Sequence, residues 1–292
     1  MNTSEYVLLT AAYNEEGFIG STIQSIVEQT HVPRQWVIVS DASTDRTDEI
    51  IRDYAATYKF IRFHRMCDPH KRNFAAKVNA INAGYALIKS LDFGFIGNVD
   101  ADITFEADYY ERLIDKFKND DRLGLAGGFI HERSKGEFVA RRHNSLSSVP
   151  HAVQMLRRQC FDSIGGYCPL PYGGEDWLAE ILARKKGWTV ASFPDLPVRH
   201  YRTTATAEGT LRGTYRLGKL DYSLGSDPTF EVLKCAARLN GRPYLFGAIT
   251  RLAGFVRLWI SREPLSVSED VAKFIRAEQR ARVRAALKLG IK

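Results

Sequence analysis

Cysteine is scarce in this sequence, and its four cysteines include no Cys-x-x-Cys pair. Cys67, Cys160, Cys168 and Cys235 therefore lack the paired spacing typical of structural zinc sites. We expect reduced thiols in a cytosolic protein without structural zinc. Residues 1–5 also lack the basic start and apolar run of a signal peptide, which agrees with a cytoplasmic location.

Long hydrophobic runs are also lacking. The most apolar stretch, residues 244–260, contains Arg251 and Arg257 and is too short and too charged to predict a membrane span. At about 100° per residue its large apolar side chains fall on one side and its glycines and arginines on the other. This pattern predicts either an amphipathic helix at a membrane surface or a helix packed on the preceding domain. The expected apolar side comprises Leu245, Ile249, Leu252, Val256, Trp259 and Ile260.

Acidic residues are depleted in the last third of the chain. From Tyr201 onwards there are 17 lysines and arginines against 8 aspartates and glutamates, while the net charge of the whole chain is +7. The basic excess is therefore confined to the C-terminal region. Such an asymmetry indicates an anionic partner, either a membrane surface or a nucleic acid.

Apolar runs and helical patterns alternate through the first hundred residues. The expected strands are 6–12, 36–39, 60–63 and 93–99, and amphipathic helical segments lie between them. This alternation predicts an α/β fold with a doubly wound, mostly parallel sheet. Ligands of such folds bind at the carboxyl ends of the strands, which places Asn14, Asp41 and Asp100 at the expected site.

The second hundred residues continue with a mixture of elements. We expect helices over 108–117, 156–164 and 177–186, strands over 123–130 and 188–193, and loops over 131–148 and 169–174. The loop 169–174 is rich in proline and glycine and leads directly to Glu175 and Asp176. His200 follows the last expected strand.

Two carboxylates follow the fourth expected strand in the sequence Asp100-Ala101-Asp102. If the strand continues, this spacing puts both side chains on one face. Paired carboxylate oxygens suit Mg²⁺ or Mn²⁺, which usually also binds substrate phosphates. An acidic turn after a strand is the alternative explanation.

Six short segments in order make residues 5–202 resemble the family 2 glycosyltransferases of the GT-A fold, specifically the non-processive bacterial type. Each segment is weak alone, and the specificity comes from their order and spacing. They are Ala12-Tyr13-Asn14-Glu15-Glu16, Val39-Ser40-Asp41-Ala42-Ser43-Thr44-Asp45, Lys77-Val78-Asn79-Ala80-Ile81-Asn82-Ala83-Gly84, Asp100-Ala101-Asp102, Ile164-Gly165-Gly166-Tyr167 and Gly174-Glu175-Asp176-Trp177.

The resemblance implies a GT-A catalytic domain over residues 1–204, with a nucleotide-binding half at 1–102 and an acceptor half at 103–204. Residues 205–292 would form a helical, basic C-terminal region. The chain departs from the family at Ala12, where proline is common, and at Ser40, where an acid is common. It also lacks the Gln/Arg-x-x-Arg-Trp motif of processive members, so we expect it to add one or a few sugars.

For the donor side, the resemblance implies a divalent metal, Mn²⁺ or Mg²⁺, bound by Asp102, with Asp100 in contact with the metal or the ribose. His200 would be a further metal ligand, and a polar residue at a strand end is its alternative role. Asp41 would accept a hydrogen bond from a pyrimidine base, which favours uracil or thymine; a helix N-cap is its alternative role. The other residues expected at the nucleotide are Asn14, Glu15, Lys77 and Asp100.

For the acceptor side, the resemblance implies that Asp176 is the general base that deprotonates the attacking hydroxyl. Glu175 and Trp177 would contact the acceptor, although Trp177 fits helix packing equally well. One base opposite one leaving group implies a single displacement with inversion at the anomeric carbon.

These expectations describe an inverting, metal-dependent glycosyltransferase that uses a UDP-sugar or dTDP-sugar and a lipid-linked or polysaccharide-precursor acceptor. We expect it in the cytoplasm, peripherally on the cytoplasmic face of the plasma membrane. A sugar-nucleotidyltransferase is one alternative, but residues 11–17 are not a glycine-rich triphosphate loop. A nucleic-acid-binding protein is the other, and no aromatic-basic RNA signature supports it.

Overall fold

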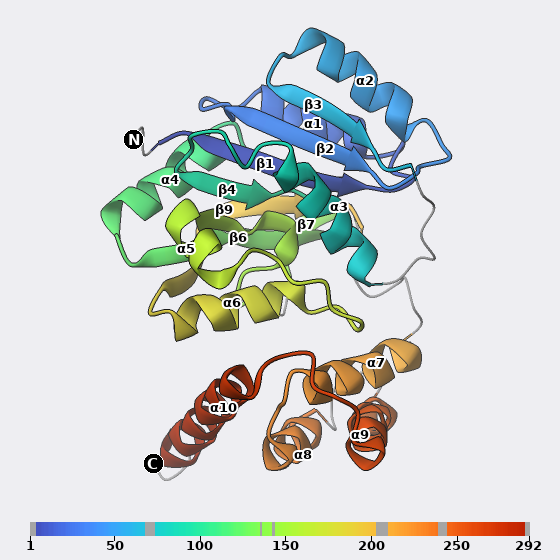
Figure 1. Ribbon diagram of the computed structural model, residues 1–292, viewed down its shortest axis with the longest axis vertical. Coiled ribbons are helices and arrows are strands. Elements are labelled where there is room, and N and C mark those ends of the chain that lie inside the picture. Colours follow the sequence, from blue (N-terminus) through green and yellow to red (C-terminus); the bar gives the residue numbers. More distant parts are fainter. Residues whose placement is uncertain are drawn as a thin grey trace. The chain divides into compact units, whose positions relative to one another are not determined.

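The computed structural model describes residues 4–67, 74–134, 136–141, 144–202, 210–238 and 244–289 (Figure 1). The chain forms two compact units. The first comprises Met1–Pro171 and Glu175–Thr203, and the second comprises Tyr172–Gly174 and Thr204–Lys292. The boundary expected after residue 204 lies outside the described residues.

The first unit is built on a mixed sheet whose N-terminal part is parallel. Its strands follow the order β3-β2-β1-β4, and the connecting helices lie between consecutive strands in the chain. β1 is apolar at almost every position because the sheet is covered on both faces, and six of its seven residues are buried. The bounds are β1 Tyr6–Ala12, α1 Ile19–Val27, β2 Gln35–Ser40, α2 Thr47–Thr57, β3 Ile61–Arg65, α3 Ala75–Ala86 and β4 Phe95–Asn98.

The sheet continues past β4 in the order β8-β6-β9-β5, and β7 pairs with β6. β8 is antiparallel to both β4 and β6, whereas β6 and β9 are parallel. The α/β fold predicted from the sequence is confirmed. The bounds are β5 Ile103–Phe105, α4 Tyr109–Asn119, β6 Leu123–Ser134, β7 Glu137–Ala140, β8 Met155–Arg157, α5 Arg158–Ile164, α6 Glu175–Lys185 and β9 Thr189–His200.

Two predictions for this region were wrong. Residues 131–148 were expected to form a loop, but β6 extends to Ser134 and pairs with β7 as an antiparallel hairpin. Residues 156–164 were expected to be helical from the start, but Met155–Arg157 forms β8 before α5 begins. α5 ends as expected at Gly165, which adopts a left-handed conformation at φ 79°.

The second unit is helical. α8 is capped by Asp227, whose carboxylate accepts the Thr229 and Phe230 backbone N–H groups, with Pro228 at the first helical position. Among the described residues, no helix is long and apolar enough to cross a membrane. The bounds are α7 Thr210–Ser223, α8 Pro228–Ala236, α9 Tyr244–Ser261 and α10 Glu269–Leu289.

α7 and α9 approach each other at backbone distance. A Cβ atom on Gly218 of α7 would lie 1.8 Å from the Arg251 carbonyl oxygen of α9. A Cβ atom on Gly254 of α9 would lie 2.1 Å from the Tyr215 carbonyl oxygen of α7. Both distances are impossible for real side chains, so the two glycines fix the crossing of α7 and α9.

The buried interior of this unit contains an ion-pair cluster. The Arg251 guanidinium contacts Asp221 at 2.5 Å and Glu231 at 3.1 Å, and Lys234 contacts the same two carboxylates at 2.8 and 2.7 Å. Removing one partner would leave a buried charge without its counter-charge. Arg251, on the side of its helix opposite the large apolar residues, therefore faces the interior of this unit.

Candidate active site

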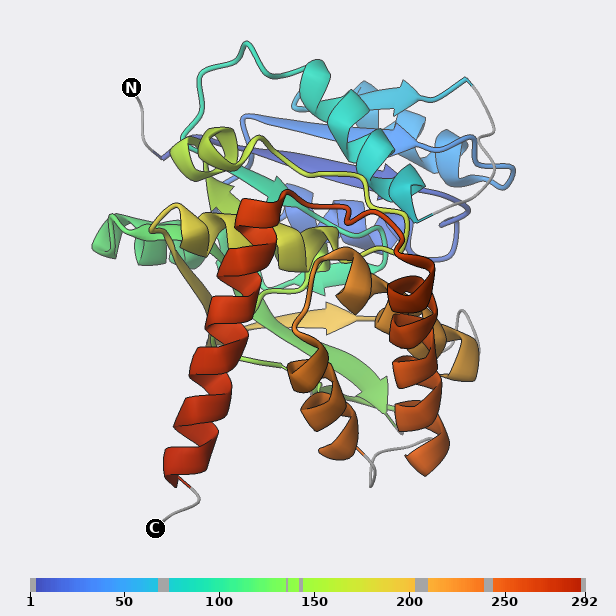
Figure 2. The same ribbon diagram turned by 60° about the horizontal axis from the view of Figure 1, so that its bottom comes forward.

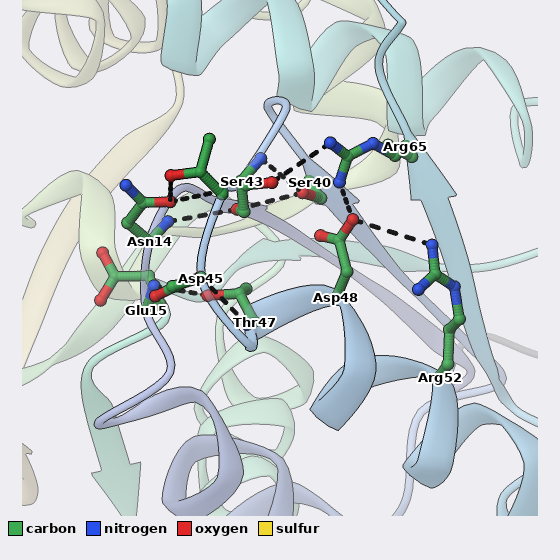
Figure 3. Close-up of polar contacts among 10 residues, drawn as sticks. Asn14, Glu15, Ser40, Ser43, Asp45, Thr47, Asp48, Arg52 and Arg65 are labelled. Atoms are coloured by element: carbon green, nitrogen blue, oxygen red, sulfur yellow. Dashed lines mark hydrogen bonds and ion pairs between the residues drawn. The ribbon is translucent and has the colours of Figure 1, made fainter.

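The loops after β1 and β2 are joined by short polar contacts (Figure 3). The Asn14 side-chain oxygen accepts the Thr44 backbone N–H at 2.8 Å, and the Asn14 backbone N–H donates to Ser43 Oγ at 3.1 Å. The Glu15 backbone N–H donates to Thr47 Oγ1 at 2.6 Å. Asn14 adopts a φ of 53°, a left-handed conformation that asparagine tolerates better than most residues. These contacts set the spacing of the two loops at the carboxyl edge of the sheet.

Asp41 follows β2 directly. Its backbone N–H donates to the Ala12 carbonyl at 2.9 Å, which ties the end of β2 to the end of β1. The N-cap residue of α2 is Arg46, without a side-chain capping bond. The alternative role of Asp41 as an N-cap is therefore wrong, and its side chain lies at the edge of the sheet where the sequence placed a ligand.

Asp100 lies beyond the end of β4, which stops at Asn98. Its Oδ1 lies 2.6 Å from Nζ of Lys77 on α3. Burial alone would raise the pKa of Asp100, but Lys77 and His151 outweigh burial and hold that pKa well below its usual range. Burial alone would lower the pKa of Lys77, but Asp100 and Glu175 raise it above its ordinary value. Asp100 is therefore an anion held by a lysine cation.

His151 is a site residue that sequence reasoning missed. Its Nδ1 lies 4.0 Å from Asp100 Oδ1, and its Nε2 lies 3.1 Å from the Asn98 amide nitrogen. Its backbone N–H donates to Asp176 Oδ2 at 3.3 Å, and its ring meets the Tyr167 ring edge-on at 5.0 Å. Only these long-range contacts identify His151, which joins the end of β4 to the start of α6.

Asp102 lies close to His200 because Ile103 of β5 pairs with His200 at the end of β9. Its Oδ1 lies 3.3 Å from His200 Nε2, and its Oδ2 lies 3.0 Å from Arg202 Nε. Arg202 also contacts the Glu15 carboxylate. Burial alone would lower the pKa of His200, but Asp102 outweighs burial and raises it. Arg202 was not singled out in the sequence.

Asp100 and Asp102 do not share a strand face as their spacing suggested. They occupy the turn between β4 and β5 and have different partners, Lys77 for Asp100 and the pair His200 and Arg202 for Asp102. Within the described residues no three His, Cys, Asp or Glu side chains form a metal-binding group. The Asp102 carboxylate, which faces the His200 imidazole, still matches Mg²⁺ or Mn²⁺ in type, since Mg²⁺ is commonly held by one or two carboxylates plus phosphates and water.

Asp176 lies in the first turn of α6, one residue after Glu175. Its Oδ2 accepts the His151 N–H, and its Oδ1 accepts the Trp177 N–H at 2.8 Å. Burial and the neighbouring Glu175 carboxylate raise the pKa of Asp176, and the hydrogen bonds only partly oppose them. A carboxylate with a raised pKa is a stronger base than an exposed one. Trp177 is half-buried beside it.

Glu180 lies one helical turn after Asp176 and is also new from the structure. Its Oε1 accepts Ser148 Oγ–H at 2.9 Å and the Val149 N–H at 2.6 Å. Only 2% of the residue is exposed, and burial raises the pKa of Glu180 to about 7. Glu180 therefore anchors the segment that leads into His151.

This anchor predicts a pH-dependent stability. Burial raises the folded pKa of Glu180 to about 7 from its ordinary value of 4.5, so the folded state favours the protonated carboxyl. The stability that this protonated form contributes is fully present below pH 4.5 and is lost as pH rises through about 7. We expect wild-type protein to lose on the order of 3 kcal/mol of unfolding free energy relative to Glu180→Gln across this range. Urea denaturation of both proteins along a pH series measures it. A parallel pair of curves would contradict the prediction, and Glu137→Gln, at an exposed position on β7, is the matched control.

By their side-chain contacts, most of the expected site residues form two groups in the first unit. In the first group Asp100 and Asp176 contact His151, and Lys77 pairs with Asp100. In the second group Glu15 and Asp102 contact Arg202, and His200 pairs with Asp102. The remaining expected residues lie on adjoining segments: Asn14 and Asp41 at the strand ends, and Glu175 and Trp177 in the first turn of α6.

Curated relatives are similar to part of this chain. The poly-beta-1,6-N-acetyl-D-glucosamine synthase of Staphylococcus epidermidis is 28% identical over 133 residues, which is 46% of this chain and 30% of that protein. The corresponding synthase of Staphylococcus aureus is also 28% identical over 133 residues, again 46% of this chain and 30% of its own length. This chain thus matches less than a third of the length of those relatives.

Solved structures share the fold over most of the chain. S. aureus TarS 1–349 has a TM-score of 0.53 at 15% identity and covers 91% of this chain and 76% of its own. TarS 1–349 in complex with UDP-GlcNAc has a TM-score of 0.54 at 14% identity and covers 93% and 78%. A protein-family model described as Glycosyl transferase family 2 matches residues 8–171, more than half of the sequence. This chain belongs to glycosyl transferase family 2.

Proposed function

We propose that this glycosyltransferase moves a sugar from a nucleotide-diphosphate donor to an acceptor hydroxyl with inversion. The observation that carries the proposal is the convergence of Asp100, from the end of β4, and Asp176, from the start of α6, on His151. It brings the expected donor-side and acceptor-side carboxylates into one site. We further propose a lipid-linked or polysaccharide-precursor acceptor, reached at the cytoplasmic face of the plasma membrane.

The proposed reaction is a single displacement. The acceptor hydroxyl oxygen attacks the anomeric carbon while its proton passes to Asp176. The bond from the anomeric carbon to the phosphate oxygen breaks, and the nucleoside diphosphate leaves with that electron pair. The raised pKa of Asp176, due to burial and Glu175, suits a base that works near neutral pH. The His151 and Trp177 N–H groups hold the carboxylate in place.

Asp102 and His200 are the residues that would hold a divalent metal, with Asp100 next to them. A Mn²⁺ or Mg²⁺ ion there would act as a Lewis acid that stabilises the negative charge of the leaving diphosphate. Lys77, held against Asp100 at 2.6 Å, adds a cation to the same region. Glu15 and Arg202 complete the polar wall next to Asp102.

The donor base provides a separate prediction. Asp41 lies at the carboxyl edge of the sheet and does not cap α2, so its carboxylate is available to accept the N3–H of uracil or thymine. We expect UDP or dTDP to raise the melting temperature more than ADP does, and Asp41→Asn to remove most of the difference. Differential scanning fluorimetry measures it. Equal protection of the wild-type protein by ADP would contradict the base-reading role.

The whole proposal is tested by a donor-hydrolysis screen over nucleotide sugars with Mn²⁺, Mg²⁺ or EDTA. UDP-N-acetylglucosamine comes first, because TarS has been crystallised with it and the curated relatives are poly-N-acetylglucosamine synthases. We expect slow, metal-dependent release of UDP from one uridine or thymidine donor. Undiminished release in EDTA would contradict metal dependence, and no release from any donor would contradict the proposed donor class.

A further inference from the structure

α9 buries an arginine and small residues together with Phe255 and Leu258, and it leaves most of its other large apolar residues exposed. Gly247, Arg251 and Gly254 are buried. α9 packs against α7 and α8 within the second unit (Figure 2). The large apolar residues on the other side are exposed: Leu245 at 51%, Phe246 at 69%, Ile249 at 54%, Trp259 at 56% and Ile260 at 73%. We call these five residues the outer α9 face.

The inward side of α9 is already satisfied without the outer α9 face. Its buried arginine is neutralised by Asp221 and Glu231, and its Gly254 contacts the α7 backbone. The helix therefore cannot turn its apolar residues inward without breaking the ion pairs and separating the backbones. Five large apolar side chains on one helix are more than the isolated exposed residues usual on soluble proteins, and such patches mark binding surfaces.

The charge around this patch identifies the partner. α9 contains no acidic residue, and the exposed Arg257 lies at the edge of the apolar side at about 100° per residue. Arg262 follows the helix and is also exposed, next to the exposed Glu263. From Tyr201 to the end, basic residues outnumber acidic ones by 17 to 8. An apolar face with a tryptophan and flanking arginines matches the interface of an anionic lipid bilayer.

We propose that the outer α9 face docks on an anionic membrane, with α9 lying in the plane of the interface. A second copy of this chain fits less well, because a two-fold contact over the same patch would bring the arginines of both copies together. The proposal deepens the membrane location given with the proposed function by naming the docking surface, and it depends on no residue of the active site. It would hold the enzyme next to a membrane-bound substrate.

The test is sedimentation of the full chain with vesicles, using phosphatidylcholine alone or mixed with phosphatidylglycerol. We expect binding to the anionic vesicles, weakened about tenfold when salt rises from about 0.05 M to about 0.5 M. The double variant Phe246→Ser, Ile260→Ser should lower the partition coefficient by about 100-fold or more, because complete burial of one such side chain changes an equilibrium by about 10- to 150-fold.

The matched control is Leu146→Ser, which removes a 66% exposed leucine from the first unit and should leave vesicle binding unchanged. Donor hydrolysis by the double variant should equal that of the wild type, so failure of docking and failure of the proposed function are distinguishable. Binding that is absent, that survives the double variant, or that is equal for neutral vesicles would overturn the proposal. So would a dimer in analytical ultracentrifugation that the double variant dissociates.

Trp259 supplies an independent readout. On anionic vesicles its emission should shift to shorter wavelength, because the exposed indole leaves water for the interface. Trp259→Phe should abolish the shift while the protein still sediments with the vesicles, since phenylalanine keeps most of the apolar surface. A shift that persists in Trp259→Phe would come from another tryptophan and would contradict docking through this face.

Discussion

Asp176→Asn should lower kcat by about 10²- to 10⁴-fold, which is the usual contribution of a general base. Asparagine keeps the size and can still accept one of the N–H groups that the carboxylate now binds, from His151 or Trp177. It cannot take the proton of the acceptor. We expect the donor Kd to stay within about twofold, because Asp176 contacts no residue expected at the nucleotide base. Steady-state kinetics and donor titration on one preparation measure both quantities.

Stability and pH separate this role from a structural one. The pKa of Asp176 is raised by burial and by Glu175, so its charged form costs folding free energy at neutral pH. Asp176→Asn should therefore leave the melting temperature at neutral pH unchanged or slightly higher, whereas loss of a structural carboxylate would lower it. Wild-type kcat should rise with pH as Asp176 loses its proton. Near-normal kcat in Asp176→Asn, with a large loss in Glu175→Gln, would move the base to Glu175.

Asp102→Asn should abolish measurable turnover and remove the metal dependence of nucleotide binding. The substitution deletes the charge that faces His200 at 3.3 Å and Arg202 at 3.0 Å. Loss of a charge-stabilising group at a developing anion costs about 10²- to 10³-fold or more in rate. Calorimetry should show that the Kd for UDP is the same with Mn²⁺ and with EDTA in the variant, but not in the wild type.

Asp53→Asn is the matched control for this experiment, because Asp53 is an exposed acid on α2 away from both site groups. It should retain wild-type turnover and metal dependence. The fold of Asp102→Asn is checked by its far-ultraviolet circular dichroism. A folded Asp102→Asn protein with metal-dependent UDP binding would show that the ion is held elsewhere, with Asp100 as the first candidate.

Local patterns predicted the parallel half of the sheet well. β1, β2 and β4 are buried at all but one position each of β1 and β2, so their apolar runs stand out and end at the residues that carry the expected chemistry. β8 escaped prediction because three residues are too few to show a period, and they run directly into α5. β7 escaped because a hairpin at the sheet edge needs no apolar alternation, and all four of its residues are exposed or half-buried.

The site was predictable only in part, because local sequence patterns do not show which distant residues come into contact. Asp100, Asp102 and Asp176 stand in recognisable segments, but their partners are fixed by contacts between distant parts of the chain. His151, Glu180 and Arg202 have no local signal, and each is identified by what it touches. For α9, periodicity separated the two sides, but it did not say which side is buried, because the counter-charges of Arg251 lie on α7 and α8.

The glycine contact between α7 and α9 has a consequence for motion. With Gly218 and Gly254 at backbone distance, α9 cannot roll about its own axis, since any roll would drive a side chain into the facing helix. The rotation of α9 about its axis is thereby fixed relative to α7. The direction in which Phe246 and Ile260 project is therefore set before any partner binds. Binding through that face would then require little reorganisation, and its entropic cost would fall mainly on side-chain rotamers.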